Sequence, residues 1–179
     1  MKYSLSALVE NKPGVLNRVV SLFRRRNFNI DSLTVGRTED PELSRMTILL
    51  EGTQAEAYKV EKTLLKLPNV VHVEHLHGKP IVIRDLALIK IRVDAKTRPE
   101  VMQLCNIFRA RIVDVAKNSV IAEVTGPEDK IESFLNLIRD IGVIEMVRTG
   151  IVAMERGEHG LAPVNEYTRT VARTARTVV

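Results

Sequence analysis

The chain has 179 residues, of which 45% are hydrophobic and 27% charged, which is typical of a globular protein of one ordinary domain or two small ones. No apolar run approaches the ~20 residues that span a bilayer, the N-terminus lacks the regions of a secretory signal, and the single cysteine excludes an internal disulfide framework. We therefore expect a cytoplasmic protein without a membrane partner, while the formal net charge of +5 keeps nucleic acid among the partners to be weighed.

The first part of the chain alternates strand and helix signals. Apolar residues recur every second position in the strands and at i, i+3 and i+4 in the helices. Pro13 suits the first position of the first helix, and Thr53 with Glu56 forms a capping box for the second. The predicted elements are a strand at 3–10, a helix at 15–26, strands at 28–35 and 43–50, a helix opened by residue 53 and ending at 67, and a strand at 70–76.

The same order of elements returns after a segment rich in glycine and proline. Thr97 and Glu100 form a second predicted capping box, and Gly142 is a plausible helix C-cap. The predicted elements are a strand at 87–93, a helix from 97 to 108, short strands at 112–116 and 120–124, a helix at 128–141 and a last strand at 143–154.

Two copies of β-α-β-β-α-β, offset by roughly 80 residues, define the fold class. We predict an α+β protein with two tandem ferredoxin-like domains, each a four-stranded antiparallel sheet with both helices on one face. The predicted domains are 1–78 and 85–157, joined by a linker at 79–84 and followed by a tail at 158–179. The other face of each sheet is open, and a small sheet with an exposed apolar face must bury it, so we expect oligomerisation.

The connection between the first strand and the first helix is the richest local feature. Backbone N–H groups in the first turn of a helix lack internal partners and attract anions. Gly14 leaves the backbone accessible, Pro13 fixes the turn, and Asn11 offers a donor and an acceptor. This set of groups matches a small zwitterion, with its carboxylate on the amides. An ordinary capped turn explains the same residues.

A second candidate site lies where Asn29, Asp31 and Ser32 interrupt an apolar strand. A solvent-facing edge or a β-bulge accounts for these polar residues equally well.

Metal and catalytic chemistry find little support in the sequence. Strand alternation places His75 and His77 on one face and His72 on the other, and no Cys or Asp pattern completes a metal site. Cys105 lies on the apolar stripe of its helix with no base to activate it, so we expect a core thiol. There is no phosphate-binding Gly-rich loop and no HExxH arrangement. We expect no catalytic residue, which favours a binding or regulatory role.

Nucleic-acid binding is also disfavoured. RNA-binding domains that share the β-α-β-β-α-β order stack bases on aromatic residues of the third strand, whereas residues 43–50 and 120–124 contain none. The excess basic residues cluster at 24–26 and in the tail, as expected for a solvated helix end or an interaction surface.

Several segments together resemble one known family. Residues 8–16, followed by Arg18 and Val19, are similar to the first loop and helix of an ACT domain. The segments that resemble the small regulatory subunit of acetohydroxyacid (acetolactate) synthase are 29–35, 43–48, 107–115 and 149–157. The resemblance covers about residues 1–157 in unbroken order.

The resemblance implies a non-catalytic subunit without a cofactor of its own. Members of this family associate with a large catalytic subunit that uses thiamine diphosphate, Mg²⁺ and FAD. They raise its activity and confer feedback inhibition by branched-chain amino acids, chiefly valine. They are homodimers whose ACT domains pair side by side, with the effector between two protomers. By matching motif positions, the expected effector-binding residues are Asn11, Pro13, Gly14, Val15 and Leu16 of one chain and Asn29 and Ile30 of the other.

Two other classes of protein share single features with this sequence. A stand-alone amino-acid-responsive transcription factor or RNA binder would suit the basic charge, but no helix-turn-helix segment is evident. An enzyme fragment that contains an ACT domain would need a catalytic domain, for which the chain has no room.

Overall fold

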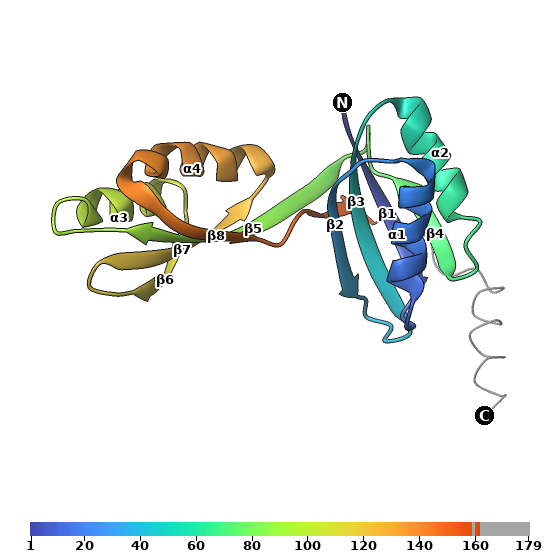
Figure 1. Ribbon diagram of the computed structural model, residues 1–179, viewed down its shortest axis with the longest axis horizontal. Helices are drawn as coiled ribbons and strands as arrows, with labels where there is room; N and C mark the ends of the chain where they lie inside the picture. Colours follow the sequence, from blue (N-terminus) through green and yellow to red (C-terminus); the bar gives the residue numbers. More distant parts are fainter. Residues whose placement is uncertain (159, 162–179) are drawn as a thin grey trace. The chain divides into compact units, whose positions relative to one another are not determined.

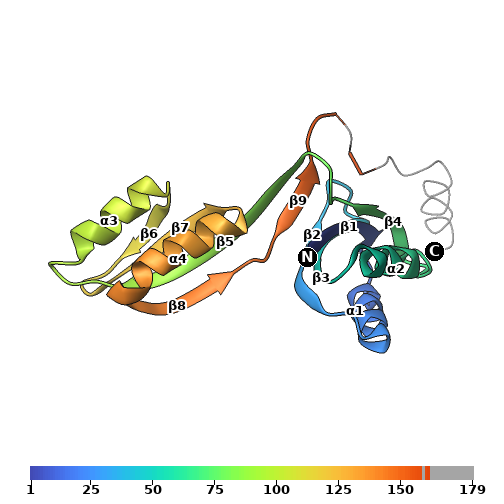
Figure 2. The ribbon, with the colours of Figure 1, turned by 90° about the horizontal axis from the view of Figure 1, so that it is seen from above.

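The computed structural model describes residues 1–158, 160 and 161, which divide into two compact units. The first comprises residues 1–82 with the described residues from 153 onward, and the second comprises residues 83–152. Each unit is built on an antiparallel sheet with two helices on one face (Figures 1 and 2), so the predicted α+β class with tandem ferredoxin-like units is confirmed. The predicted tail lies outside the described residues apart from 158, 160 and 161.

The first unit follows the predicted order of elements. Its sheet runs β2-β3-β1-β4, so β1 is central and is paired antiparallel with both β3 and β4. The elements are β1 (Lys2–Glu10), α1 (Val15–Arg26), β2 (Ile30–Arg37), β3 (Leu43–Glu51), α2 (Gln54–Leu64) and β4 (Val70–His75).

The core of the first unit lies between the sheet and its two helices. Leu5 of β1, Val19 of α1 and Val60 of α2 have no exposed surface. The capping box at the start of α2 is confirmed, because Thr53 Oγ1 accepts from the Glu56 backbone N–H (3.3 Å) while the Thr53 backbone N–H donates to Glu56 Oε2 (2.7 Å). Side-chain periodicity and a local cap therefore act together to place α2.

The helix-free face of the first sheet carries both polar and apolar side chains. Ser6 of β1 is fully buried, and Arg45 Nε of β3 donates to its Oγ (2.9 Å). Ser4 and Thr47 are buried on the same face, where the register pairs Ser6 with Thr47. Leu8 and Leu49 are buried on this face as well, where the register pairs Leu8 with Arg45 and Leu49 with Ser4.

The second unit repeats the topology, with strand order β6-β7-β5-β8. Its elements are β5 (Ile81–Arg92), α3 (Arg98–Ile107), β6 (Arg111–Val115), β7 (Ser119–Gly126), α4 (Glu128–Gly142) and β8 (Val143–Arg148). The short strand β9 (Val152–Glu155) pairs with β5 but belongs to the first unit from residue 153 onward. The start of β5 at Ile81 shows that the predicted linker at 79–84 is partly strand.

Two local predictions for the second unit were wrong. Thr97 makes no side-chain cap to α3; instead Asp94 Oδ1 accepts from the backbone N–H groups of Lys96 and Thr97 (both 2.8 Å) and organises the turn before the helix. The predicted last strand divides into β8 and β9, because Gly150 between them has a left-handed φ of 80°.

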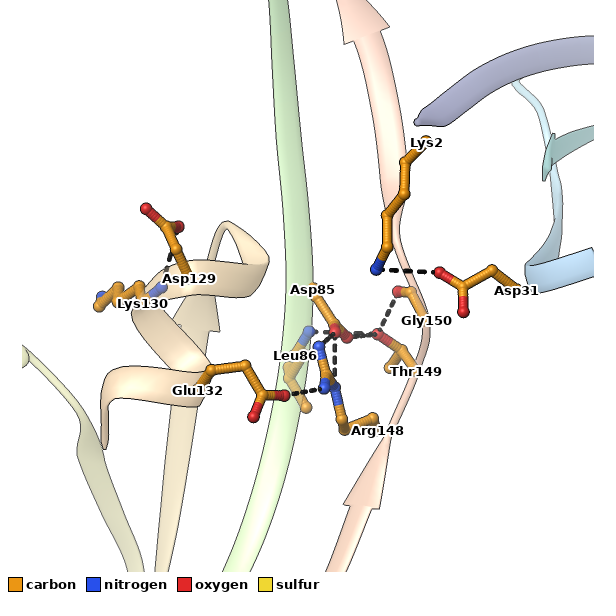
Figure 3. A network of polar contacts seen from close by, with 10 residues as sticks. All are labelled: Lys2, Asp31, Asp85, Leu86, Asp129, Lys130, Glu132, Arg148, Thr149 and Gly150. Atoms are coloured by element: carbon orange, nitrogen blue, oxygen red, sulfur yellow. Dashed lines mark hydrogen bonds and ion pairs between the residues drawn. The ribbon is translucent and has the colours of Figure 1, made fainter. Parts of the chain in front are cut away.

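A buried ion pair holds the start of β5 to the end of β8 in the second unit (Figure 3). The Asp85 side chain is 1% exposed and accepts from both Nε (2.8 Å) and Nη2 (2.5 Å) of Arg148. Arg148 Nη1 also donates to Glu132 Oε1 of α4 (2.7 Å). Burial alone would lower the pKa of Arg148, but the hydrogen bonds and charges of Asp85 and Glu132 outweigh it and raise the pKa.

Replacing Asp85 with alanine tests this ion pair. We expect a loss of about 3 kcal/mol in the free energy of unfolding of the second unit, because the guanidinium is left partly buried without its main partner. Glu132→Gln is the matched control and should cost under about 1 kcal/mol, since the Glu132 side chain is 45% exposed. Urea unfolding combined with hydrogen exchange of the β5 amides would measure the free energy of unfolding of both variants. Equal losses of stability in the two variants would contradict the role of Asp85 as the main partner of Arg148.

Candidate functional site

The turn between β1 and α1 is built around Gly14. This residue is the N-cap of α1 with φ 84° and ψ −10°, a left-handed conformation that glycine adopts without steric cost. A Cβ placed on Gly14 would meet no atom within 4 Å, so the backbone here faces open space. The helix begins at Val15 rather than at Pro13, which lies one residue before the cap.

The start of α1 presents free donors. The Val15 N–H donates to the Lys12 carbonyl (3.3 Å), and the Arg18 N–H donates to the Gly14 carbonyl (3.0 Å). Among the described residues, the N–H groups of Gly14, Leu16 and Asn17 have no acceptor. With no side-chain cap in place, these amides lie at the positive end of the helix dipole and suit a carboxylate.

Asn11 has a structural bond as well as a free acceptor. Its backbone N–H donates to the Glu42 carbonyl (2.7 Å), and its Nδ2 donates to the Pro41 carbonyl (2.9 Å). These bonds fasten the β2–β3 turn beside the Gly14 turn. The Asn11 side-chain oxygen then remains available as an acceptor.

The two hydrophobic residues of the predicted site have different environments. Val15 is 4% exposed and packs in the core, so only its backbone lines the turn. Leu16 is 44% exposed and presents an apolar side chain next to the free amides.

Asn29 and Ile30 lie at the opposite end of α1 from Gly14. The 12 residues of α1 separate them by about 18 Å at the usual rise per residue. Asn29 is exposed and Ile30 is half-buried, paired with Leu50 of β3. The register shifts between Ile30 and Ser32, which accords with the β-bulge, one of the two alternatives that the sequence left open. The structure thus does not bring the two halves of the predicted site together within one chain.

Sequence reasoning missed two polar residues at the Gly14 end of α1. Asn69, just before β4, donates through Nδ2 to Glu10 Oε2 (2.6 Å), and its side-chain oxygen accepts from Arg18 Nη1. Arg18 therefore places a positive charge one turn into α1, close to the free amides. The signals available in the sequence were its position four residues after Gly14 and its place in the segment that resembles an ACT domain.

The alternative chemistries find no geometric support. His72 pairs with Leu8 and His75 with Leu5, so these two histidines lie on opposite faces of β4, as predicted. Within the described residues, no group of three or more His, Cys, Asp or Glu side chains is placed to hold a metal, and no helix is long and apolar enough to cross a membrane.

Cys105 is 1% exposed in the core of the second unit, and burial raises the pKa of its thiol. We expect Ellman's reagent to label Cys105 much more slowly in the native chain than in the urea-unfolded chain, because both access and thiolate formation are suppressed. Equal rates of absorbance change in the two states would contradict the burial of this thiol.

The fold and the glycine turn define a class of protein: tandem ferredoxin-like units, the first with exposed strand-to-helix amides as in an ACT-type domain. Residues 5–72 match the family described as the AHAS small subunit-like ACT domain, and residues 84–157 match the small subunit of acetolactate synthase. The chain belongs to the acetolactate synthase small-subunit family, that of the regulatory subunits, as the resemblance implied.

Individual relatives agree with this family. The chain is 52% identical over 157 residues to the probable acetolactate synthase small subunit of Archaeoglobus fulgidus, covering 88% of this chain and 98% of the relative. It is 44% identical over 159 residues to the acetolactate synthase small subunit of Mycolicibacterium smegmatis, covering 89% and 94%. The crystal structure of the small subunit from Thermotoga maritima superposes with a TM-score of 0.83 at 43% identity, covering 89% of this chain and 99% of that one.

Proposed function

We propose that this regulatory subunit raises the activity of a large catalytic subunit and makes it sensitive to feedback inhibition by branched-chain amino acids, chiefly valine. One observation carries the effector part of the proposal. The amides of Gly14, Leu16 and Asn17 lie free and together at the positive end of α1. A carboxylate is the ligand group that satisfies them best, and the exposed Leu16 beside them suits a short aliphatic side chain.

The effector site is shared by two protomers in this proposal. An isologous dimer with antiparallel α1 helices brings the Gly14 turn of one chain to Asn29 and Ile30 of the other, and twofold symmetry then creates two equivalent sites. The separation of the two halves within one chain supports this arrangement. So does the exposed apolar surface of α1 and the edge strand β2, where Leu16, Val20 and Val35 are each more than 40% exposed.

The mechanism of inhibition is thermodynamic linkage. Valine inhibits only if it binds the inhibited arrangement of the complex more tightly than the active one. A coupling free energy of about 1–3 kcal/mol is sufficient for a useful response. A site assembled from two chains meets this requirement, because its geometry changes whenever the two protomers shift relative to each other.

The catalytic partner supplies the chemistry in this proposal. Thiamine diphosphate, Mg²⁺ and FAD are carried by the large subunit, and this chain works without a cofactor in the cytoplasm. The relatives' printed names as small subunits of acetolactate synthase support such a division of labour.

Gly14→Asp tests the effector site. The new carboxylate can cap the free amides and occupy the position of the ligand's carboxylate, so we expect the valine concentration for half-inhibition to rise about tenfold or more while activation of the catalytic subunit persists. Acetolactate formation by the reconstituted complex, titrated with valine, is the measurement.

Gly78→Asp is the matched control for this variant. Gly78 has φ 80° and open space around its Cβ position, as Gly14 does, so the two substitutions impose the same backbone strain. We expect Gly78→Asp to retain valine sensitivity. Full valine sensitivity in Gly14→Asp, or an equal loss of valine sensitivity in both variants, would rule out an effector site at the Gly14 turn.

The division of labour has its own test. The purified chain alone should form no acetolactate, and affinity purification from its native cytoplasm should recover a thiamine-dependent large subunit. Acetolactate formation by the isolated chain would overturn the regulatory assignment.

A further inference from the structure

The second unit contains an open cavity that no step of the proposed function uses. Its volume is about 520 Å³, within the range of small-molecule sites. It lies where β5 ends, α3 begins, the β6–β7 hairpin turns and α4 meets β8. The residues that line it and matter here are Arg92, Asp94, Asn118, Ser119, Ile141 and Ile144.

This corner is the topological counterpart of the Gly14 turn. In the first unit, Glu10 at the end of β1 pairs with Leu43 at the start of β3, and Val9 pairs with Val70 at the start of β4. In the second unit, Arg92 at the end of β5 pairs with Ser119 at the start of β7, and Ile91 pairs with Val143 at the start of β8. Arg92 therefore occupies the position of Glu10.

The two corners differ in whether their polar groups are used. In the first unit, Asn69 Nδ2 donates to Glu10, and Asn11 Nδ2 donates to the Pro41 carbonyl of the neighbouring turn, so these donors are already paired. In the second unit, the side chains of Arg92, Asn118 and Ser119 have no hydrogen-bond or ion-pair partner among the described residues, and all three residues line one cavity. The corner of the second unit is thus open, and its hydrogen-bonding side chains are unpaired within the described part of the chain.

The walls of the cavity are fixed independently of these groups. The Val93 N–H donates to the Asn118 carbonyl (3.0 Å), which holds the hairpin against the end of β5. Arg98 Nη2 donates to the carbonyls of Ala116 (2.9 Å) and Lys117 (2.6 Å), which ties the start of α3 to the same hairpin. Asp94 Oδ1 accepts the hydrogen bonds of its own turn, and none of these bonds uses Oδ2.

We propose that this cavity is a second ligand site, which binds a small carboxylate with an aliphatic body. Arg92 takes the carboxylate, since a guanidinium binds carboxylates in a planar, bidentate manner, and Asn118 and Ser119 add hydrogen bonds. Ile141 and Ile144 form the apolar wall, and Ile144 is 48% exposed in the free chain. An amino acid and a 2-oxo acid share this chemistry; an amino acid would also place its ammonium group toward Asp94.

Isoleucine methyl NMR spectra of the full chain test the proposal directly. The probes are L-valine, 3-methyl-2-oxobutanoate and L-valinamide, which lacks the carboxylate. We expect saturable shifts of the Ile141 and Ile144 δ1 methyl signals with at least one carboxylate and none with the amide. The carboxylate that binds more tightly shows whether the ammonium group contributes.

Variants separate this site from the Gly14 turn and from adventitious binding. The shifts should persist in Gly14→Asp, so failure of the first site would leave this one intact. Arg92→Gln should weaken binding about tenfold or more, whereas Arg111→Gln, an exposed arginine on β6 outside the cavity, should leave it unchanged. Unmoved methyl signals with both carboxylates, equal shifts with valinamide, or equal affinities of the two arginine variants would each overturn the proposal.

Discussion

Each unit of this protein depends on a central strand that is hydrogen-bonded on both sides. β1 lies between β3 and β4, and β5 lies between β7 and β8, so neither strand can shift without breaking two ladders. A shift of one residue would also turn the core residues of either strand toward the other face. The end of each central strand is therefore a fixed point, and the turn into the following helix begins at a defined place. The backbone amides of the Gly14 turn and the cavity beside Arg92 both depend on this constraint.

Much of the fold follows from local sequence signals, and the errors have identifiable causes. The Thr53 capping box was predictable because no nearby group competes for its bonds. The equivalent signal at Thr97 failed because of Asp94, three residues earlier. Asp94 Oδ1 accepts from the backbone N–H groups of Lys96 and Thr97, so the Thr97 N–H is not left for a capping box with Glu100. Likewise, the apolar alternation from Val143 to Met154 predicted one strand, but Gly150 adopts a left-handed conformation that a regular strand does not accommodate.

The candidate sites show where sequence reasoning ends. The free amides near Gly14 were predictable, because a helix start preceded by Pro and Gly exposes them whatever the tertiary structure. The role of Val15 was not, since only packing shows that its side chain belongs to the core. The cavity of the second unit was missed altogether. Arg92, Asn118 and Ile144 are far apart along the chain and form no motif, and only the strand register brings them together.

The second unit has a further property, which concerns its ends. In the sequence, residues 83–152 lie between the two segments that form the first unit. Close to the two ends of this stretch, the Thr149 N–H donates to the Leu86 carbonyl (3.0 Å). A segment whose two ends meet in this way has the architecture of an inserted domain. Such a segment can gain loops, be exchanged for a related domain or be replaced by a short linker, because the chain segments on either side of it remain close to each other. Evolution can therefore vary the second unit without rebuilding the turn that begins α1.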